Sequence, residues 1–280
     1  MSTTLELLKR IHAEDCKAVA KLAAALPSVA EAAEAIAARL EAKGRWLSVG
    51  AGTSGRLAAL DAAELPPTFG TSPDLVRAFL AGGDAALRAA VEGAEDEEEM
   101  ARRTLDEAGL TAQDAVVGVS ASGTTPFVLS ALAHARARGA LTVAIVTVAG
   151  SPLAAMANRA IVVDVGPEVL KGSTRMKAGT VQKMILTMLS TAVMARRGLV
   201  YRDEMVALRP TNEKLKKRAV RIVSELLDRS DEEAAALLMG AGWDVPVALV
   251  AGRHGLAAAE ARQRLEKAGG NVARLLRDDH

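Results

Sequence analysis

The chain has 280 residues, of which 50% are hydrophobic and 2% aromatic, and its 35 Lys and Arg nearly balance its 34 Asp and Glu. Such a chain can bury a large core, but it lacks the basic surface and the stacking aromatic residues that nucleic-acid binding needs. Its single cysteine, Cys16, cannot form an internal disulfide. The first residues lack the apolar run of a signal peptide, and the longest apolar stretches are too short to span a bilayer. We therefore expect a soluble cytoplasmic protein that binds neither nucleic acid nor membranes.

The first 43 residues are expected to be helical. Residues 5–43 are rich in Ala, Leu, Glu and Lys at helical spacing. Proline interrupts a helix interior but suits a first turn, so Pro27 is expected to divide this stretch in two. The second helix then begins at Pro27 or Ser28.

Five short apolar runs follow, most of them rich in Val and most ending in Gly. They occupy residues 45–52, 75–83, 115–123, 141–150 and 160–166. Helical segments separate most of them. Nearly continuous apolar strands that alternate with helices are typical of a parallel sheet covered on both faces, so an α/β domain is predicted.

After residue 167 no further strand is expected. Residues 173–198 predict one long helix that Gly198 ends, and two or three more helices are expected to about residue 228. Three short helices are predicted within 230–277. The expected organisation is therefore N-terminal helices over 1–43, an α/β domain with long C-terminal helices over 44–228, and a small helical bundle over 229–280.

The first predicted strand leads into a glycine-rich loop, "VGAGTSGRLAAL" (49–60), with the spelling G-x-G-x-x-G. The start of a helix after such a loop attracts an anion. A dinucleotide site also needs an acidic residue at the end of the second strand, but Asp74 precedes that strand, and a P-loop needs Gly-Lys-Ser/Thr. Thr53 and Ser54 add hydroxyl donors, which favours a phosphate monoester. The alternative is a tight turn whose glycines only permit close packing.

The third predicted strand ends in "SASGTTP", which holds Ser120, Ser122, Thr124 and Thr125 before another helix. Ligands of open α/β sheets bind at the carboxyl ends of the strands. These hydroxyls are therefore expected at the same edge as the glycine-rich loop.

The stretch "KGSTRMKAGT" is expected to begin the long helix, with Ser173 and Thr174 at its start and Arg175 and Lys177 in its first turn. Cations near a helix N-terminus are unfavourable unless an anion is nearby. Three hydroxyl-rich helix starts are hard to explain by packing, and together they favour a phosphate site.

Two glutamates are candidate acid–base groups. Glu64, in "LDAAELPPTFG", is expected at a helix end before a Pro-Pro break, where the macrodipole would raise its pKa and suit a general acid. A solvated surface glutamate is the alternative. The stretch "VEGAEDEEEM" (91–100) holds six acidic residues, most of them expected on a solvated face. Glu95 is the best placed to turn inward, although spacing alone does not select it.

The sequence shows no pattern of a metal site or of a serine hydrolase. The four histidines lack metal-ligand spacing, there is no cysteine cluster, and no serine lies in a G-x-S-x-G elbow. We therefore expect a site without metal or cofactor.

Five stretches together resemble the N-acetylmuramic acid 6-phosphate etherases of the sugar isomerase (SIS) superfamily, which are related to the glucokinase regulatory proteins. They are "GAGTSGRLAALDAAELPPTFG", "VEGAED", "ASGTTPF", "GSTRMKAGTVQKMILTMLST" and "TNEKL". The likeness runs from about residue 4 to residue 276 in one order and spacing. It implies an SIS fold and a dimer with the site near the subunit interface.

The resemblance also implies a reaction, in the recycling of cell-wall amino sugars. The family cleaves the lactyl ether of N-acetylmuramic acid 6-phosphate to N-acetylglucosamine 6-phosphate and D-lactate, by elimination followed by hydration. By motif matching, Glu64 is the acid and Glu95 the base. The matching also assigns substrate contacts, which are Thr53, Ser54, Ser122, Thr124, Ser173 and Lys177.

This sequence departs from the family pattern at three places. The family usually has a longer N-terminal extension, an Arg where Thr124 stands, and a Cys where Leu65 stands. The change at Thr124 affects one expected substrate contact. Two alternatives remain open: an SIS isomerase that uses a glutamate to move a proton between the carbons of a sugar phosphate, and a non-catalytic sugar-phosphate sensor.

Overall fold

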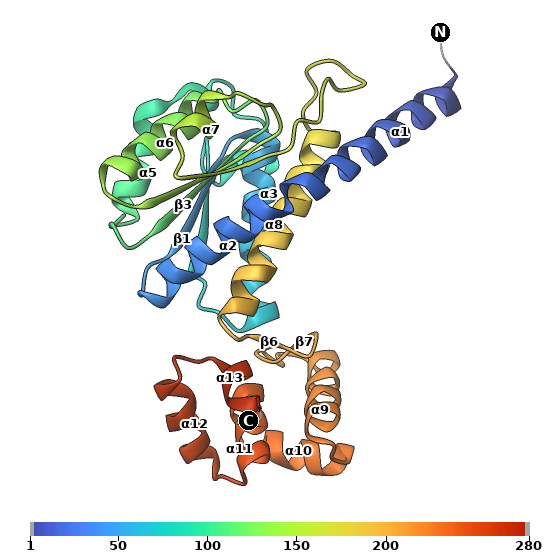
Figure 1. Cartoon of the computed structure of the whole chain (residues 1–280), viewed down its shortest axis with the longest axis vertical. Coiled ribbons are helices and arrows are strands. Elements are labelled where there is room, and N and C mark those ends of the chain that lie inside the picture. Colours follow the sequence, from blue (N-terminus) through green and yellow to red (C-terminus); the bar gives the residue numbers. More distant parts are fainter. Residues whose placement is uncertain (1–2, 278–280) are drawn as a thin grey trace. The chain divides into compact units, whose positions relative to one another are not determined.

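The computed structural model describes residues 3–277, and its chain forms two compact units (Figure 1). The first unit contains Met1–Ala63 and Pro73–Ala192, and the second contains Glu64–Ser72 and Val193–His280. The helices before residue 43 thus group with the sheet, and residues 193–228 group with the later helices, unlike the predicted division at 43/44 and 228/229. Residues 1–2 and 278–280 of the predicted terminal segments lie outside the described residues.

The N-terminal stretch forms two helices as predicted. Helix α1 (Thr4–Leu22) has a capping box, in which the Thr3 and Glu6 side chains each accept a hydrogen bond from the other's backbone N–H. A 3₁₀ turn (Ala23–Ala25) leads to α2 (Leu26–Glu41), whose first turn contains Pro27. Helix α2 buries its apolar face and contacts β4 and β5 of the sheet.

The five predicted strands form one parallel sheet in the order β2-β1-β3-β4-β5. Their bounds are β1 (Trp46–Gly50), β2 (Val76–Leu80), β3 (Ala115–Ser120), β4 (Leu141–Val146) and β5 (Arg159–Val162). The central strands β1, β3 and β4 are buried along their whole length, as expected of a sheet covered on both faces. The predicted α/β class and the parallel sheet are confirmed.

Helices cover both faces of the sheet (Figure 1). On one face lie α5 (Glu98–Glu107), α6 (Pro126–Ala137) and α7 (Pro152–Met156), whose side chains share a buried core with the strands. On the other lie α2, α3 (Gly52–Phe69) and α8 (Lys177–Arg196). A short helix, α4 (Ala85–Arg88), follows β2.

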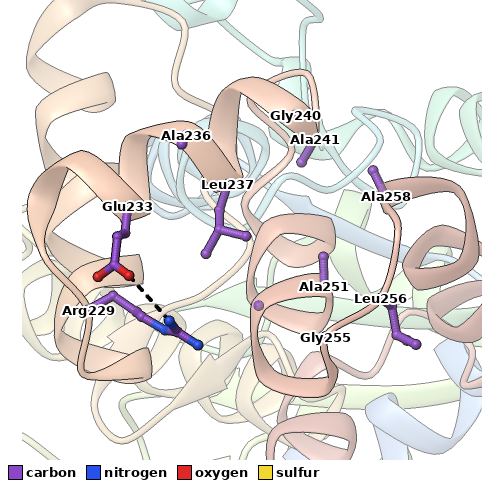
Figure 2. Close-up of a pocket in the computed structure, with 11 residues that line it drawn as sticks. Arg229, Glu233, Ala236, Leu237, Gly240, Ala241, Ala251, Gly255, Leu256 and Ala258 are labelled. Atoms are coloured by element: carbon purple, nitrogen blue, oxygen red, sulfur yellow. Dashed lines mark hydrogen bonds and ion pairs between the residues drawn. The ribbon is translucent and has the colours of Figure 1, made fainter.

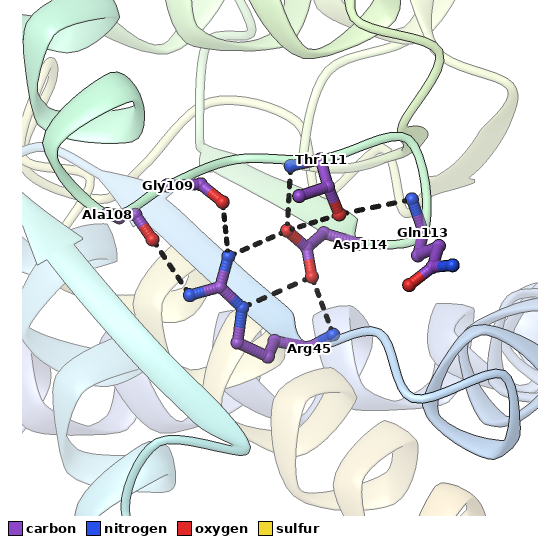
Figure 3. Close-up of polar contacts among 6 residues, drawn as sticks. All are labelled: Arg45, Ala108, Gly109, Thr111, Gln113 and Asp114. Carbon is purple, nitrogen blue, oxygen red and sulfur yellow. Dashed lines mark hydrogen bonds and ion pairs between the residues drawn. The ribbon is translucent and has the colours of Figure 1, made fainter.

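The amino ends of β1 and β3 are fixed by a network around Asp114 (Figure 3). Its carboxylate accepts hydrogen bonds from the Arg45 backbone at 2.7 Å, the Arg45 guanidinium at 2.8 Å and the Thr111 backbone at 2.9 Å. Arg45 also donates to the carbonyls of Ala108 and Gly109. Burial raises the pKa of Asp114, but these hydrogen bonds outweigh burial and leave the pKa below its ordinary value.

The second unit is mostly helical, and it differs from the predictions first in the stretch before residue 228. A two-stranded hairpin, β6 (Val200–Tyr201) and β7 (Glu204–Met205), follows Gly198, although no strand was expected there. Its turn holds Arg202 and Asp203 at positive φ, without the Asn-Gly or Gly pattern that marks such turns in a sequence. Only one helix, α9 (Glu213–Leu227), lies between this hairpin and residue 228.

Four short helices, instead of the predicted three, occupy residues 230–277. They are α10 (Asp231–Gly240), α11 (Val245–His254), α12 (Ala258–Lys267) and α13 (Val272–Leu276). A cavity of about 510 Å³ lies beside α10 and α11, lined mainly by small and apolar side chains (Figure 2). Its two charged residues, Arg229 and Glu233, pair with each other at 3.3 Å. Within residues 3–277, no single helix has the length and hydropathy to cross a membrane.

Candidate functional site

The stretch expected to be a glycine-rich loop is mostly the first turn of a helix at the carboxyl edge of the sheet, because β1 ends at Gly50 and α3 begins at Gly52. Gly50, the last residue of β1, pairs in register with Val119 of β3, so the loops after these two strands are neighbours. A Cβ atom on Gly50 would lie 2.7 Å from the Gly55 nitrogen, and one on Gly55 would lie 2.7 Å from the Gly50 carbonyl oxygen. Both glycines therefore allow the first turn of α3 to lie against the end of β1. The glycines are therefore needed for close packing, and this packing also fixes the direction of the first turn of α3.

In the first turn of α3, Ser54 is buried and its hydroxyl donates to the Gln182 side-chain oxygen at 2.9 Å. Gln182 lies on α8 with no exposed surface, and its side-chain nitrogen has no hydrogen-bond partner among the described residues. A buried donor without a partner is costly. Sequence reasoning missed Gln182, because nothing in the stretch "VQKMIL" (181–186) distinguishes it from its exposed polar neighbours.

The loop between β3 and α6 presents two exposed hydroxyls. The Ser122 oxygen accepts hydrogen bonds from the Thr124 hydroxyl at 2.9 Å and the Thr124 backbone at 3.2 Å. The Ser122 oxygen also lies 3.5 Å from the Ser120 hydroxyl, so the Ser122 proton can point either to Ser120 or to a ligand. Behind them, Ser120 is buried and bonds to Thr125 and to the backbone of Gly123, so it holds the loop in shape.

The long helix begins later than predicted. Helix α8 starts at Lys177, and Ser173, Thr174 and Arg175 lie in turns before it. The backbone N–H groups of Lys177 and Ala178 donate to the Glu168 carboxylate at 3.3 and 3.0 Å. An acidic side chain distant in sequence thus caps the helix, which the local pattern of residues could not show.

Lys177, a predicted substrate contact, is buried and forms an ion pair at 2.7 Å with Glu14 of α1. Hydrogen bonds from Lys17 and then Lys177 lower the pKa of Glu14 to about 2. The sequence indicated that an anion must lie near Lys177, and in this structure that anion is the carboxylate of Glu14.

Glu64 is exposed on α3, and the premise of a helix end at this residue was wrong. The helix continues to Phe69 through Pro66 and Pro67, and Gly70 ends it with positive φ and a hydrogen bond to the Pro66 carbonyl. Glu64 is thus more than one turn from the helix end, outside the range where the macrodipole is strong. It is the first residue of the α3 segment that groups with the second unit.

Glu95 lies in a 3₁₀ turn (Ala94–Asp96) on the path that returns from the end of β2. Its acidic neighbours Glu98 and Glu99 each pair with Arg102. Glu95 is exposed and forms no hydrogen bond or ion pair with any residue of the range 3–277. Its carboxylate is consequently free to act on a ligand. In that range no group of three His, Cys, Asp or Glu is arranged to hold a metal ion.

Arg56, on the first turns of α3, fixes the segment that precedes Glu95. Its guanidinium donates to the carbonyls of Ala86 and Ala89 at 2.9 and 3.1 Å. The glycine-rich loop and the chain leading to Glu95 are therefore held together by one side chain that sequence reasoning did not single out.

Two family models match the part of the chain that contains the sheet. The N-terminal SIS domain of glucokinase regulatory protein matches residues 28–136, and the SIS domain matches residues 91–192. Phosphoheptose isomerases from Francisella tularensis and Neisseria gonorrhoeae align with 69% of this chain and with 100% and 99% of theirs. Their TM-scores are 0.55 and 0.54 at 21% identity, so they establish the shared fold alone.

Curated relatives match nearly the whole chain. It is 46% identical over 272 residues to N-acetylmuramic acid 6-phosphate etherase 2 of Lactiplantibacillus plantarum, across 97% of this chain and 92% of that protein. It is 47% identical over 274 residues to the etherase of Geobacillus thermodenitrificans, across 98% and 93%. Identity at this level over almost the full length of both proteins shows that the chain belongs to the N-acetylmuramic acid 6-phosphate etherase family.

Proposed function

We propose that this chain cleaves the lactyl ether of N-acetylmuramic acid 6-phosphate, releasing D-lactate and leaving N-acetylglucosamine 6-phosphate. One observation of the structure carries this proposal beside the family membership. Exposed hydroxyls of the β3–α6 loop and the helix start after β1 lie at one edge of the sheet, where the strand ends are neighbours. Hydroxyl and backbone N–H donors at a helix start suit a phosphate group.

In the proposed reaction, the Glu95 carboxylate takes the proton from carbon 2 of the open-chain sugar, which the aldehyde acidifies. The electron pair forms a double bond between carbons 2 and 3, and the bond from carbon 3 to the ether oxygen breaks. Glu64 protonates that oxygen as lactate leaves, and water then adds across the double bond. The exposed, unpaired state of Glu95 supports its role, because a base must reach its proton with a free carboxylate.

We propose that the phosphate is held by Ser122, Thr124, Thr53, Ser54 and Ser173. Thr124 replaces a side chain that is commonly Arg in the family, so it supplies a hydroxyl where others supply a charge. Lys177 is also a proposed contact. An ammonium has three N–H donors, so Lys177 can bond to phosphate while it keeps its ion pair with Glu14.

The test is incubation of the purified protein with N-acetylmuramic acid 6-phosphate and an assay for D-lactate, with and without a chelator. We expect lactate release that needs no added metal or nucleotide. Ketose formation without lactate would overturn the proposal in favour of an SIS isomerase. Binding of the sugar phosphate with no turnover would favour a sensor.

A homodimer in the cytoplasm is part of the same proposal. Leu5 and Leu8 lie three residues apart on the first turns of α1 and are 60% and 56% exposed. A partner subunit would cover them. Sedimentation velocity measures the assembly directly, and a monomer at micromolar concentration would overturn it.

A further inference from the structure

A cavity of about 350 Å³ lies between the first turns of α3 and the start of α8, within the first unit. Its lining includes Thr53 and Leu57 of α3, and Arg175, Gly179, Thr180 and Lys183 from the segment around the start of α8. A Cβ atom on Gly179 would lie 3.4 Å from the Thr53 methyl carbon and 3.5 Å from the Thr174 carbonyl oxygen. Any larger residue at this position would therefore narrow the cavity.

Two positively charged side chains that have no acidic partner within residues 3–277 line the cavity. Arg175 and Lys183 form no ion pair or hydrogen bond with another residue in the described part of the chain. By contrast, Lys177 of the same segment pairs with Glu14, and the first N–H groups of α8 bond to Glu168. Two like charges beside one cavity repel each other, and an anion between them would remove that cost.

The cavity adjoins the proposed phosphate loop, because Thr53 lines it and the next residue is Ser54. The two sets of groups nevertheless differ in chemistry. The loops after β1 and β3 offer hydroxyls and backbone N–H groups, which surround a tetrahedral phosphate well. Arg175 offers a planar guanidinium, whose paired N–H groups match a carboxylate.

We propose that Arg175 and Lys183 bind the carboxylate of the lactyl group, an inference that rests on the proposed function. The substrate of that reaction carries two anionic groups, the phosphate on carbon 6 and the lactyl carboxylate on the side chain of carbon 3. The structure provides two kinds of anion site next to each other. Holding both groups would fix the ether oxygen between them, so this cavity determines specificity for sugars that carry an acidic ether.

The product N-acetylglucosamine 6-phosphate separates this role from phosphate binding, because it keeps the phosphate and lacks the carboxylate. The experiment compares Arg175→Met, Lys183→Met and Ser54→Ala. It measures the KM of N-acetylmuramic acid 6-phosphate and the inhibition constants of N-acetylglucosamine 6-phosphate and D-lactate. Arg196→Met is the matched control, since it removes an exposed charge from the same helix outside the cavity.

We expect Arg175→Met to raise the KM by about 10- to 100-fold, the usual effect of a lost hydrogen bond to a charged group, and Lys183→Met to raise it by less. Both should leave inhibition by N-acetylglucosamine 6-phosphate within about 2-fold of the unmutated value and weaken inhibition by D-lactate. Arg175→Lys should lie between, because lysine keeps the charge and loses the paired N–H groups. Ser54→Ala should weaken the binding of the substrate and of the sugar-phosphate product to the same extent.

Two outcomes overturn the carboxylate assignment alone. If Arg175→Met weakens product binding as much as substrate binding, Arg175 binds phosphate. If it changes neither the KM nor the inhibition constants, and thermal unfolding is unaltered, the cavity binds no part of the substrate. Absence of lactate release from the unmutated protein would instead overturn the proposed function, and the assignment with it.

Discussion

The two ends of strands β1 and β3 differ in what their polar groups do. At the amino ends, Arg45 and Asp114 bond to each other and to neighbouring backbone, and Asp114 has only 1% of its surface exposed. At the carboxyl ends, the loop after β3 presents the exposed hydroxyls of Ser122 and Thr124. Glu95, on the chain that returns from β2, is exposed and has no partner in residues 3–277. Polar groups that satisfy one another stabilise a fold, whereas groups left unsatisfied at a sheet edge are available to a ligand. We propose that the same strands separate a structural end from a ligand-binding one.

The largest expected effect is on catalysis at the carboxyl edge. Glu95→Gln keeps the size of the side chain and removes its basicity, so lactate release should fall by at least about 10²- to 10⁴-fold, the usual contribution of a positioned base. Glu92→Gln, another exposed glutamate of the same segment, is the control and should retain activity. Initial rates at saturating substrate measure both. Activity retained in Glu95→Gln and lost in Glu92→Gln would move the base to Glu92.

At the amino edge the expected effect is on stability. Asp114→Ala leaves Arg45 without its carboxylate, and breaking such a buried pair destabilises by about 3 kcal/mol. Denaturant unfolding should show this loss, while the KM of the protein that remains folded should not change. An unchanged unfolding free energy, or a raised KM in folded protein, would mean that the two edges are not as separate as their polar contacts indicate.

Substitutions in the phosphate loops should have a smaller effect and act on binding. Ser54→Ala and Ser122→Ala each remove one hydroxyl. Each should weaken substrate binding by about 1–3 kcal/mol, because a hydrogen bond to a charged phosphate is lost. Inorganic phosphate should inhibit the unmutated protein competitively and the two variants less. If phosphate does not inhibit, and both KM values are unchanged, the phosphate lies elsewhere.

The smallest effect is expected at Gln182, which acts through Ser54. While the amide oxygen accepts the Ser54 proton, that proton does not point at a ligand, and the amide nitrogen lacks a partner. A half-turn of the amide would place its nitrogen beside the Ser54 oxygen and free the Ser54 proton for phosphate. Gln182→Met should therefore weaken phosphate inhibition by about 3- to 10-fold.

A double-mutant cycle distinguishes this positioning role from general support of the helix packing. In a Ser54→Ala background, Gln182→Met should have no further effect on phosphate inhibition. Gln182→Glu, which keeps an acceptor and removes the donor, should weaken inhibition at least as much as Gln182→Met. If the effects of Ser54→Ala and Gln182→Met simply add, Gln182 does not act through Ser54.

The sheet could be predicted because its determinants are local. Strands β1, β3 and β4 are buried on both faces, so their sequences are continuous apolar runs, and Pro27 marks a helix boundary by its own geometry. The hairpin around Arg202 and Asp203 was missed because its turn residues carry no glycine. The course of α3 through Pro66 and Pro67 was missed because prolines usually end a helix.

The site was predictable only in part. Hydroxyls after β1 and β3 could be placed at one edge, because parallel strands share a carboxyl end. The partners that matter most come from distant segments: Gln182 for Ser54, Glu14 for Lys177 and Glu168 for the start of α8. No local pattern encodes such contacts, and none reveals that Arg175 and Lys183 face one cavity.

The proposed roles of Glu95 and Glu64 are tested most directly by exchange of the carbon 2 hydrogen of the substrate with deuterated water, followed by proton NMR. If Glu95 removes that proton, Glu95→Gln should abolish both exchange and lactate release. Glu64→Gln removes only the acid, so lactate release should fall by about 10²- to 10⁴-fold while exchange remains measurable. Exchange that survives in Glu95→Gln and disappears in Glu64→Gln would contradict the assignment and reverse the roles of the two glutamates.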